Sequence, residues 1–208
     1  ELINTCVEEG CMPSKSILAG AHKGEDMQTV MQTRDAHITR LRNALEEGLA
    51  SDGLEILHGM GRVTGTSEVT VMTEAGEVVF ETKSIIIATG SHSFVPPIPG
   101  LDVTDERIMV SDEVVSIKHT IKETPERVLV IGAGPIGLEL ATFFHDMGSS
   151  VDVLQRGPLL RSMDPEFGEE RLRASKDEST FPIHCHSRLT RVVHEYDHLR
   201  CTIVQNDT

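Results

Sequence analysis

Two cysteines near the start of the chain have a spacing and a context that could support redox chemistry. Cys6 and Cys11 lie five positions apart in the run T-C-V-E-E-G-C-M-P-S-K. On an ideal helix this separation gives about 7.5 Å of rise, with the side chains about 140° apart. A disulfide needs Cα atoms within about 7 Å of each other. The pair can therefore close only where the backbone departs from a helix, and we expect Gly10 to provide that freedom.

The surroundings of the two thiols differ, which predicts different roles for them. Pro13 favours the first turn of a helix directly after Cys11, and the positive end of a helix stabilises a thiolate. Lys15 adds a positive charge one turn further on. We expect Cys11 to have the lower pKa and Cys6 to be the thiol that exchanges with a substrate. A structural disulfide, or two unrelated thiols, is the alternative that the spacing leaves open.

A glycine-rich run in the second half of the chain is typical of dinucleotide binding. The run V-L-V-I-G-A-G-P-I-G-L-E contains the G-x-G-x-x-G motif, follows an apolar strand and opens an apolar helix. Such a turn needs its first glycine for the bend, its second for approach to a pyrophosphate and its third for helix–strand packing. The expected coenzyme-binding residues here are Gly132, Gly134, Pro135, Ile136 and Gly137. A glycine turn without a ligand is the alternative.

The residues after the next strand indicate which coenzyme would bind. An Asp or Glu there would accept the ribose 2′-hydroxyl of NAD. Gln155, 23 positions after Gly132, and Arg156 occupy that place instead. The missing carboxylate and the added cation favour the 2′-phosphate of NADPH, with an ordinary surface role for Arg156 as the alternative.

A group of histidines near the end of the chain is a competing candidate site. His184 and His186 flank Cys185 and would share one face of a strand, and His194 and His198 lie four positions apart. No C-x2-C pair accompanies them, and ten histidines in 208 residues make chance clustering easy. We therefore predict no metal site.

Composition narrows the function classes. The 208 residues include 33 acidic and 19 basic side chains, for a net charge of −14, which would repel nucleic-acid phosphates and anionic lipid. We therefore expect neither nucleic acid nor a membrane as partner. Four cysteines do not form a secreted disulfide framework, so a reducing, cytoplasmic compartment is expected.

Hydrophobic periodicity predicts an α/β fold that positions these residues. In the first half we expect an irregular segment (1–12), a short helix (13–22), a long amphipathic helix (27–50), three antiparallel strands (54–63, 68–73 and 77–82) and a strand buried on both faces (84–88). In the second half we expect a short helix (111–115), a strand (127–131), a helix ending near 147, a strand (151–154), another helix (165–176) and mixed strands (183–204). Arg34 alone interrupts the apolar stripe of the long helix.

The order of these elements predicts Rossmann-like dinucleotide-binding domains with three layers, together with an antiparallel β-meander. We expect a partial FAD-binding domain with the cysteine pair over 1–92 and a partial NAD(P)-binding domain over 93–208. The prolines at 96, 97 and 99 would stiffen the connection between them.

The motifs together resemble the flavin-dependent pyridine nucleotide–disulfide oxidoreductases. The resemblance rests on Thr5–Lys15 in the C-x4-C-x-P-S-K form, on Ala88-Thr89-Gly90-Ser91, and on the glycine turn at 132–137. It is closest to the group that contains dihydrolipoamide dehydrogenase, mercuric reductase and glutathione reductase. The run V-D-V-L-Q-R-G-P is more similar to mercuric-reductase-like members, which have an Arg at that point.

The resemblance implies roles residue by residue. Cys11 would contact the flavin and form the charge-transfer species, and Cys6 would be the interchange thiol. Lys15 would lie beside the flavin ring and pair with the acid Glu139 near the hydride path. The Ala88-Thr89-Gly90 segment would close on FAD.

The resemblance also implies a reaction and a larger enzyme. Electrons would pass between NAD(P)H, FAD and the active-site disulfide, with a small disulfide or dithiol, or Hg²⁺, as substrate and a homodimer as the active form. The family's first FAD-binding glycine turn, its later flavin motif and its dimerisation domain are absent from these residues. The isolated chain is therefore expected to be inactive. A non-catalytic nucleotide-binding or redox-sensing module is the alternative.

Overall fold

The structure, a computed structural model, describes residues 5–160, 163–174 and 180–205. Its first elements are α1 (Thr5–Glu8), α2 (Cys11–His22), α3 (Met27–Ser51), β1 (Met60–Gly65), β2 (Glu68–Thr73), β3 (Gly76–Glu81) and α4 (Ser111–Val115). The remaining elements are β4 (Arg127–Ile131), α5 (Pro135–Asp146), β5 (Ser150–Leu154), α6 (Pro165–Ala174), β6 (Ile183–His184), β7 (Ser187–His194) and β8 (Leu199–Gln205).

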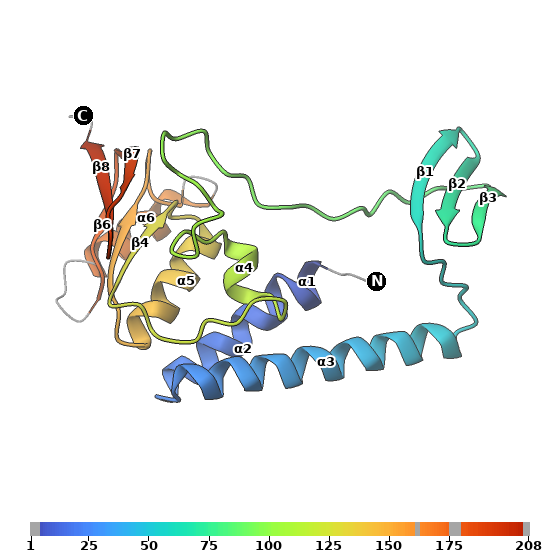
Figure 1. Cartoon of the computed structure of the whole chain (residues 1–208), viewed down its shortest axis with the longest axis horizontal. Helices are drawn as coiled ribbons and strands as arrows, with labels where there is room; N and C mark the ends of the chain where they lie inside the picture. The colour runs from blue at the N-terminus through green and yellow to red at the C-terminus, as the bar shows by residue number, and fades with distance from the viewer. Residues whose placement is uncertain (1–4, 161–162, 175–179, 206–208) are drawn as a thin grey trace.

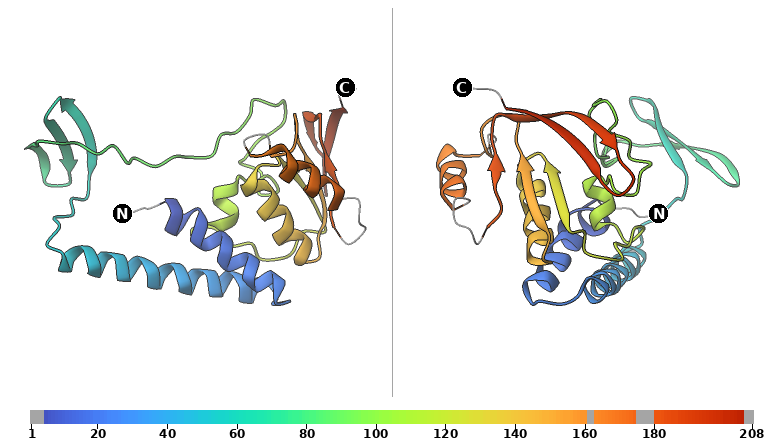
Figure 2. Two further views of the ribbon diagram at one scale, coloured as in Figure 1. Left: turned by 180° about the vertical axis from the view of Figure 1, so that it is seen from behind. Right: turned by 60° about the vertical axis from the view of Figure 1, so that its left-hand side comes forward.

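Two parts of the molecule are distinct in Figure 1. Residues 43–87, called the arm, comprise the end of α3, β1–β3 and the start of the segment that leads back. The other described residues form the main body, in which α2 and α5 lie beside the sheet of β4–β6 (Figure 2). The arm places its three strands far from the other two sheets, at the distal end of α3 (Figure 1).

The main body has the predicted Rossmann-like order. β4 and β5 pair in parallel, with Val128 opposite Val151, and α5 connects them. Alternate residues of this sheet face two apolar clusters: Val153 lies with α2 and α5, whereas Leu154 lies with the β7–β8 hairpin. Helices, parallel sheet and hairpin thus form three layers, which confirms the fold class.

The larger cluster combines both halves of the chain. Ile17 and Val30, from α2 and α3, are buried together with Leu140, Phe143 and Phe144 of α5. Burying each such side chain contributes roughly 1.5–3 kcal/mol. The helix that carries Cys11 and the helix that follows the glycine turn are therefore fixed by one core, while the division of the chain at residues 92 and 93 stays a prediction.

The helices near the start of the chain begin earlier than the sequence predicted. The segment expected to be irregular contains α1, and α2 starts at Cys11 rather than at Pro13. The long helix is confirmed within a residue, and its start is capped by the Asp26 carboxylate, which accepts the N–H of Thr29 at 2.8 Å. Short helices such as α1 are stabilised by tertiary contacts, and these leave little trace in periodicity.

Arg34 does not interrupt packing in the way that its charge suggests. Its side chain is fully buried, and its guanidinium donates to Asp35 Oδ1 at 2.9 Å and to the carbonyl of His119 at 2.9 Å. Because a buried cation needs such partners, Arg34 ties α3 to the segment that follows α4.

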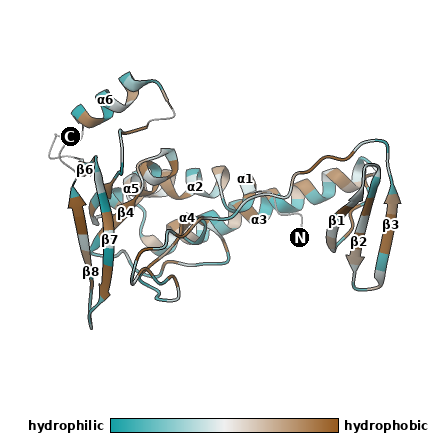
Figure 3. Ribbon diagram, turned by 90° about the horizontal axis from the view of Figure 1, so that it is seen from above, coloured by the Kyte–Doolittle hydropathy of each residue, from teal (hydrophilic) through white to brown (hydrophobic). Residues whose placement is uncertain are grey.

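The antiparallel meander of the arm is confirmed, although its first strand begins at Met60 rather than at Leu54. β1 pairs with β2 and β2 pairs with β3, with Val69 opposite both Val63 and Phe80. Its apolar side chains remain largely exposed, and Figure 3 shows these partly brown strands far from the main body. Its hydrogen bonds are local, so the meander forms without packing on the main body.

The buried strand predicted at Ser84–Ala88 is wrong. This segment is extended but belongs to no strand, and Ile86 and Ile87 are 90% and 74% exposed. A strand buried on both faces needs a neighbour that supplies ladder hydrogen bonds. Among the described residues no strand pairs with this segment, which explains the difference.

Candidate redox and dinucleotide-binding site

The structure brings the two cysteines of the motif together. Cys6 lies in α1, the chain breaks its helical path at Gly10, and Cys11 is the first residue of α2. Neither thiol is in a disulfide, and both are exposed. A hydrogen bond between the two side chains is the main reason why the pKa of Cys6 is raised above its ordinary value. The pair is therefore positioned to form a disulfide.

Gly10 permits this approach through its backbone conformation and through its lack of a side chain. Its φ of −140° and ψ of −111° lie outside the helical and extended regions. A Cβ at this position would lie 2.7 Å from the carbonyl oxygen of Thr5 and 3.4 Å from Cys6 Cα. The sequence predicted this glycine, and the structure adds a second reason for it: α1 packs directly on the start of α2.

Two ion pairs hold α1 in place. The nearly buried carboxylate of Glu8 accepts a hydrogen bond at 2.7 Å from Arg42 Nε of α3, and Arg42 Nη2 lies 2.7 Å from the same carboxylate oxygen. Glu9 pairs with Lys118 at 3.7 Å. Sequence reasoning missed these contacts because Glu8 and Arg42 are 34 positions apart and neither belongs to a motif.

Lys15 and Glu139 also meet. The Lys15 ammonium on α2 donates to Glu139 Oε1 on α5, and the two side chains are 61% and 36% exposed. Each residue lies one turn into its helix, behind Cys11 in α2 and behind the glycine turn in α5. The ion pair therefore stands between the thiols and the dinucleotide motif.

The segment Ala88-Thr89-Gly90-Ser91, on which the family resemblance also rested, reaches the start of α1. Gly90 has a φ of +76°, and a Cβ there would lie 3.3 Å from Thr5 Oγ1, at the start of α1. Ala88 and Thr89 are exposed. The structure thus brings one end of this segment to α1 but does not form the strand that was expected before it.

The glycine turn has the predicted geometry. Gly132 has a φ of +105°, and a Cβ on Gly137 would lie 2.0 Å from the Gly132 carbonyl oxygen. Gly134 caps α5, a Cβ there would meet only open space, and Pro135 follows in the first turn. The first-turn amides, including that of Ile136, have no partner within the helix, so the residues present fit a pyrophosphate.

The ribose-side residues have different environments. Gln155 Oε1 accepts the N–H of Ala133 at 3.1 Å, and Gln155 Nε2 donates to the Pro158 carbonyl at 3.0 Å. Arg156 is exposed. Of the two predicted coenzyme residues, Arg156 is thus exposed, whereas Gln155 is half-buried and bonded at both ends of its amide.

The histidines of the competing candidate site are dispersed. His184 contacts Asp152 at 2.7 Å, His194 contacts Asp105 at 2.7 Å, and His198 contacts its neighbour Asp197. In the described parts of the chain, no three His, Cys, Asp or Glu side chains are grouped to hold a metal ion. Burial raises the pKa of the Cys185 thiol, which favours its neutral form.

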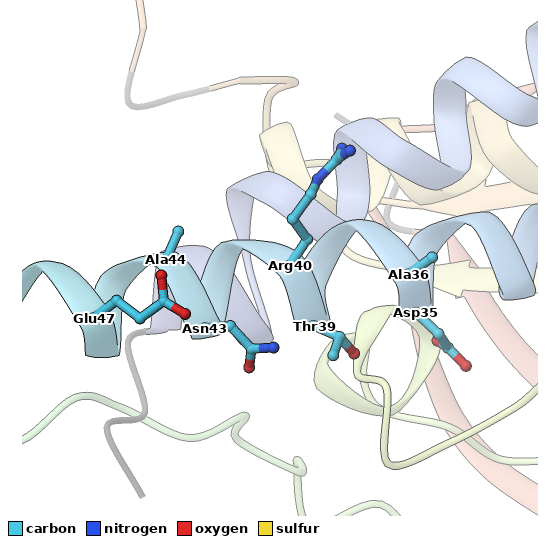
Figure 4. A pocket seen from close by; sticks show the side chains of 7 residues that line it. All are labelled: Asp35, Ala36, Thr39, Arg40, Asn43, Ala44 and Glu47. Atoms are coloured by element: carbon cyan, nitrogen blue, oxygen red, sulfur yellow. The ribbon is translucent and has the colours of Figure 1, made fainter.

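A surface hollow on α3 is no part of this arrangement. Figure 4 shows that its lining side chains come from a single helix, between Asp35 and Glu47. The thiols and the glycine turn lie elsewhere. Within the described residues, no helix combines the length and apolar character needed to cross a bilayer.

Comparison with known proteins shows which family the chain belongs to. The family model described as pyridine nucleotide-disulphide oxidoreductase matches residues 1–208. The chain belongs to this family, which confirms the resemblance that its motifs predicted.

Among curated relatives, dihydrolipoyl dehydrogenase of Acholeplasma laidlawii is 29% identical over 183 residues, covering 78% of this chain and 52% of the relative. Mercuric reductase of Bacillus cereus is 32% identical over 193 residues, covering 84% and 29%. The chain thus spans about half, or less, of the relatives it matches.

A solved structure has the same fold. It is a Cu(II) complex of the HOCl-induced flavoprotein disulfide reductase RclA from Escherichia coli, with a TM-score of 0.82 and 24% sequence identity. The match covers 96% of this chain and 44% of the other.

Proposed function

We propose that this chain is the disulfide and coenzyme part of a flavoprotein disulfide oxidoreductase of the dihydrolipoamide dehydrogenase type. One observation carries the proposal. Two exposed thiols that share a hydrogen bond lie on α1 and at the first residue of α2, and the Lys15–Glu139 ion pair connects α2 to α5, which begins at the glycine turn. Family membership supports the same reading.

The thiols would perform the exchange with the substrate. In the direction of substrate reduction, the Cys6 thiolate attacks a substrate disulfide, and one substrate thiol leaves while a mixed disulfide forms. The Cys11 thiolate then attacks Cys6 Sγ and releases the second substrate thiol, which leaves the Cys6–Cys11 disulfide. Two electrons have passed to the substrate, and two protons complete its thiols.

The remaining residues would place the cofactors. Bound FAD would relay two electrons between NAD(P)H and the Cys6–Cys11 pair. Cys11 and Lys15 would face its ring, with Gly90 bordering the same region, and Glu139 would hold the Lys15 ammonium in position. The glycine turn would hold the coenzyme pyrophosphate. Because Arg156 is an exposed cation at the ribose end, we infer a preference for NADPH.

The substrate and the assembly are part of the proposal. A small disulfide or dithiol is the first substrate class, and Hg²⁺ is the alternative that the mercuric reductase relatives favour. The active form would be a homodimer in a reducing, cytoplasmic compartment. A non-catalytic redox-sensing module would retain the thiol pair but would not turn over coenzyme.

The test uses the full-length enzyme, reduced anaerobically with NADPH. We expect a flavin spectrum and two new thiols per chain, labelled at Cys6 and Cys11. Changing either one to Ser should abolish disulfide reduction, whereas Cys201→Ser, the matched control, should retain it. A flavin-free protein that does not oxidise NADPH would contradict the proposal and support the redox-sensing alternative.

A further inference from the structure

The side chain of Gln155 joins two segments that would border the coenzyme ribose. Its carbonyl oxygen accepts the N–H of Ala133, inside the glycine turn, at 3.1 Å. Its amide nitrogen donates to the carbonyl of Pro158, in the loop after β5, at 3.0 Å. One side chain therefore connects the phosphate-binding turn to the loop that carries Arg156.

The backbone of Gln155 is also engaged. Its N–H donates to the His184 carbonyl at 2.9 Å, and its carbonyl accepts the N–H of Ser187 at 3.0 Å. Both ends of the side-chain amide and both backbone groups are thus bonded within the main body. A ribose hydroxyl would have to compete with these existing bonds.

The two partners fix the chemistry that this position needs. The Ala133 N–H can only donate and the Pro158 carbonyl can only accept, so the side chain must offer one acceptor and one donor. An amide supplies both. A carboxylate would keep the bond to Ala133 but would face the Pro158 oxygen with a second set of lone pairs, which is repulsive.

We propose that Gln155 is a positioning residue that holds the 156–158 loop against the glycine turn and does not itself bind the ribose. This inference rests on the proposed coenzyme function. Arg156 lies between two fixed points, Gln155 and Pro158, so its backbone is held where its side chain can reach a 2′-phosphate. Arg156 then determines the preference for NADPH over NADH, whereas the affinity for both coenzymes depends on Gln155.

The main experiment compares Gln155→Met, which keeps the length but removes both hydrogen bonds, with Arg156→Ala. In the full-length enzyme, Gln155→Met should raise the Kd of NADPH and of NADH by a similar factor, about tenfold. It should also speed hydrogen exchange at the Ala133 amide. Arg156→Ala should weaken NADPH alone and leave exchange at Ala133 unchanged.

Gln155→Glu gives a readout that a merely structural role would not produce. At pH 8 the carboxylate faces the Pro158 carbonyl, so both coenzymes should bind weakly. At pH 5 a protonated carboxyl group can donate to that carbonyl, and part of the affinity should return. Gln155→Met should show no such recovery.

Two results would overturn the inference. Tighter NADH binding by Gln155→Glu at pH 8 would show direct ribose contact, and unchanged exchange at Ala133 in Gln155→Met would show that the bond is unimportant. Failure of the proposed function is separable, because the unmodified protein would then bind neither coenzyme while exchange at Ala133 still responded to Gln155→Met.

Discussion

The main body and the arm contain the same kinds of sequence pattern, but only the main body buries them. Ile38 and Leu45 belong to one apolar stripe on α3, yet Ile38 is fully buried whereas Leu45 is 44% exposed. The β-strands differ in the same way, since Val153 of β5 is buried and Val79 of β3 is exposed. Periodicity therefore predicts which element forms, but not what covers it.

Within the arm, strands form only where the pairing partner is near in the sequence. The meander β1–β3 forms in the arm because each strand follows its partner directly in the chain. Ser84–Ala88, in contrast, has the composition of a buried strand but lacks a partner among the described residues. Strand identity thus depends on a neighbour that a single segment does not specify.

The largest expected effect comes from the glycine turn of the main body. Gly137→Ala would place a Cβ 2.0 Å from the Gly132 carbonyl oxygen. We expect the free energy of unfolding to fall by about 4 kcal/mol, measured by urea denaturation. The matched control in the arm is Gly61→Ala, where the Cβ meets open space and a change within about 0.5 kcal/mol is expected. Equal losses would contradict the comparison.

A smaller effect is expected within α3 itself. Ile38→Ala should lower the free energy of unfolding by about 3 kcal/mol, because it leaves a cavity in a closed core. Leu45→Ala should cost less than about 1 kcal/mol, because that side chain is already in contact with water. Chemical denaturation of both variants checks this. A large loss for Leu45→Ala would show that something covers the arm in solution.

The next largest effect is expected at the Glu8–Arg42 ion pair, which lies at the junction of the arm and the main body. Glu8→Ala leaves Arg42 without its carboxylate, and we expect a loss of about 2 kcal/mol, reduced from the fully buried case because Arg42 is about one-third exposed. It should also loosen α1 and lower the equilibrium constant for forming the Cys6–Cys11 disulfide against dithiothreitol. Glu170→Ala, which removes an exposed pair with Arg173, should change neither quantity. No change in the disulfide constant for Glu8→Ala would refute the positioning of Cys6 by this pair.

The smallest effect concerns pH and the segment that leads into the main body. His194 contacts the Gly100 carbonyl and the Asp105 carboxylate through its two ring nitrogens, and both contacts raise its pKa above the ordinary value of 6.5. Hydrogen bonds from Arg107, and after it from His194, lower the pKa of Asp105 below its ordinary value of 3.8, and the Asp102 carboxylate also faces His194 and Asp105.

The directions of these two pKa shifts determine how the stability of this segment changes with pH. The His194 contribution is fully present below pH 6.5 and is lost as the pH rises through the raised value, whereas the Asp105 contribution is lost only in acid. Hydrogen exchange in residues 99–107 should therefore quicken from pH 6 to pH 8, after correction for the intrinsic rate. β2 in the arm is the internal reference. His194→Gln should remove the pH dependence, and a dependence that survives this change would disprove the assignment.

The motifs of the site were predictable because each is local. The glycine turn specifies its own bend and its own packing, and the cysteine motif contains the glycine that lets α1 approach α2. The Glu8–Arg42 pair and the Gln155 bonds join residues brought together by tertiary packing, so spacing alone does not reveal them. Arg34 shows the same limit, since its charge indicated an interruption where the fold provides partners.

The most direct test of the central claim is to map disulfides in this chain after equilibration with oxidised dithiothreitol. The account predicts one intramolecular Cys6–Cys11 disulfide, with the half-buried Cys185 and Cys201 still reduced. Gly10→Val should suppress it, because the added side chain would push α1 away from α2. Free Cys6 and Cys11, or disulfides scattered over all four cysteines, would contradict the account.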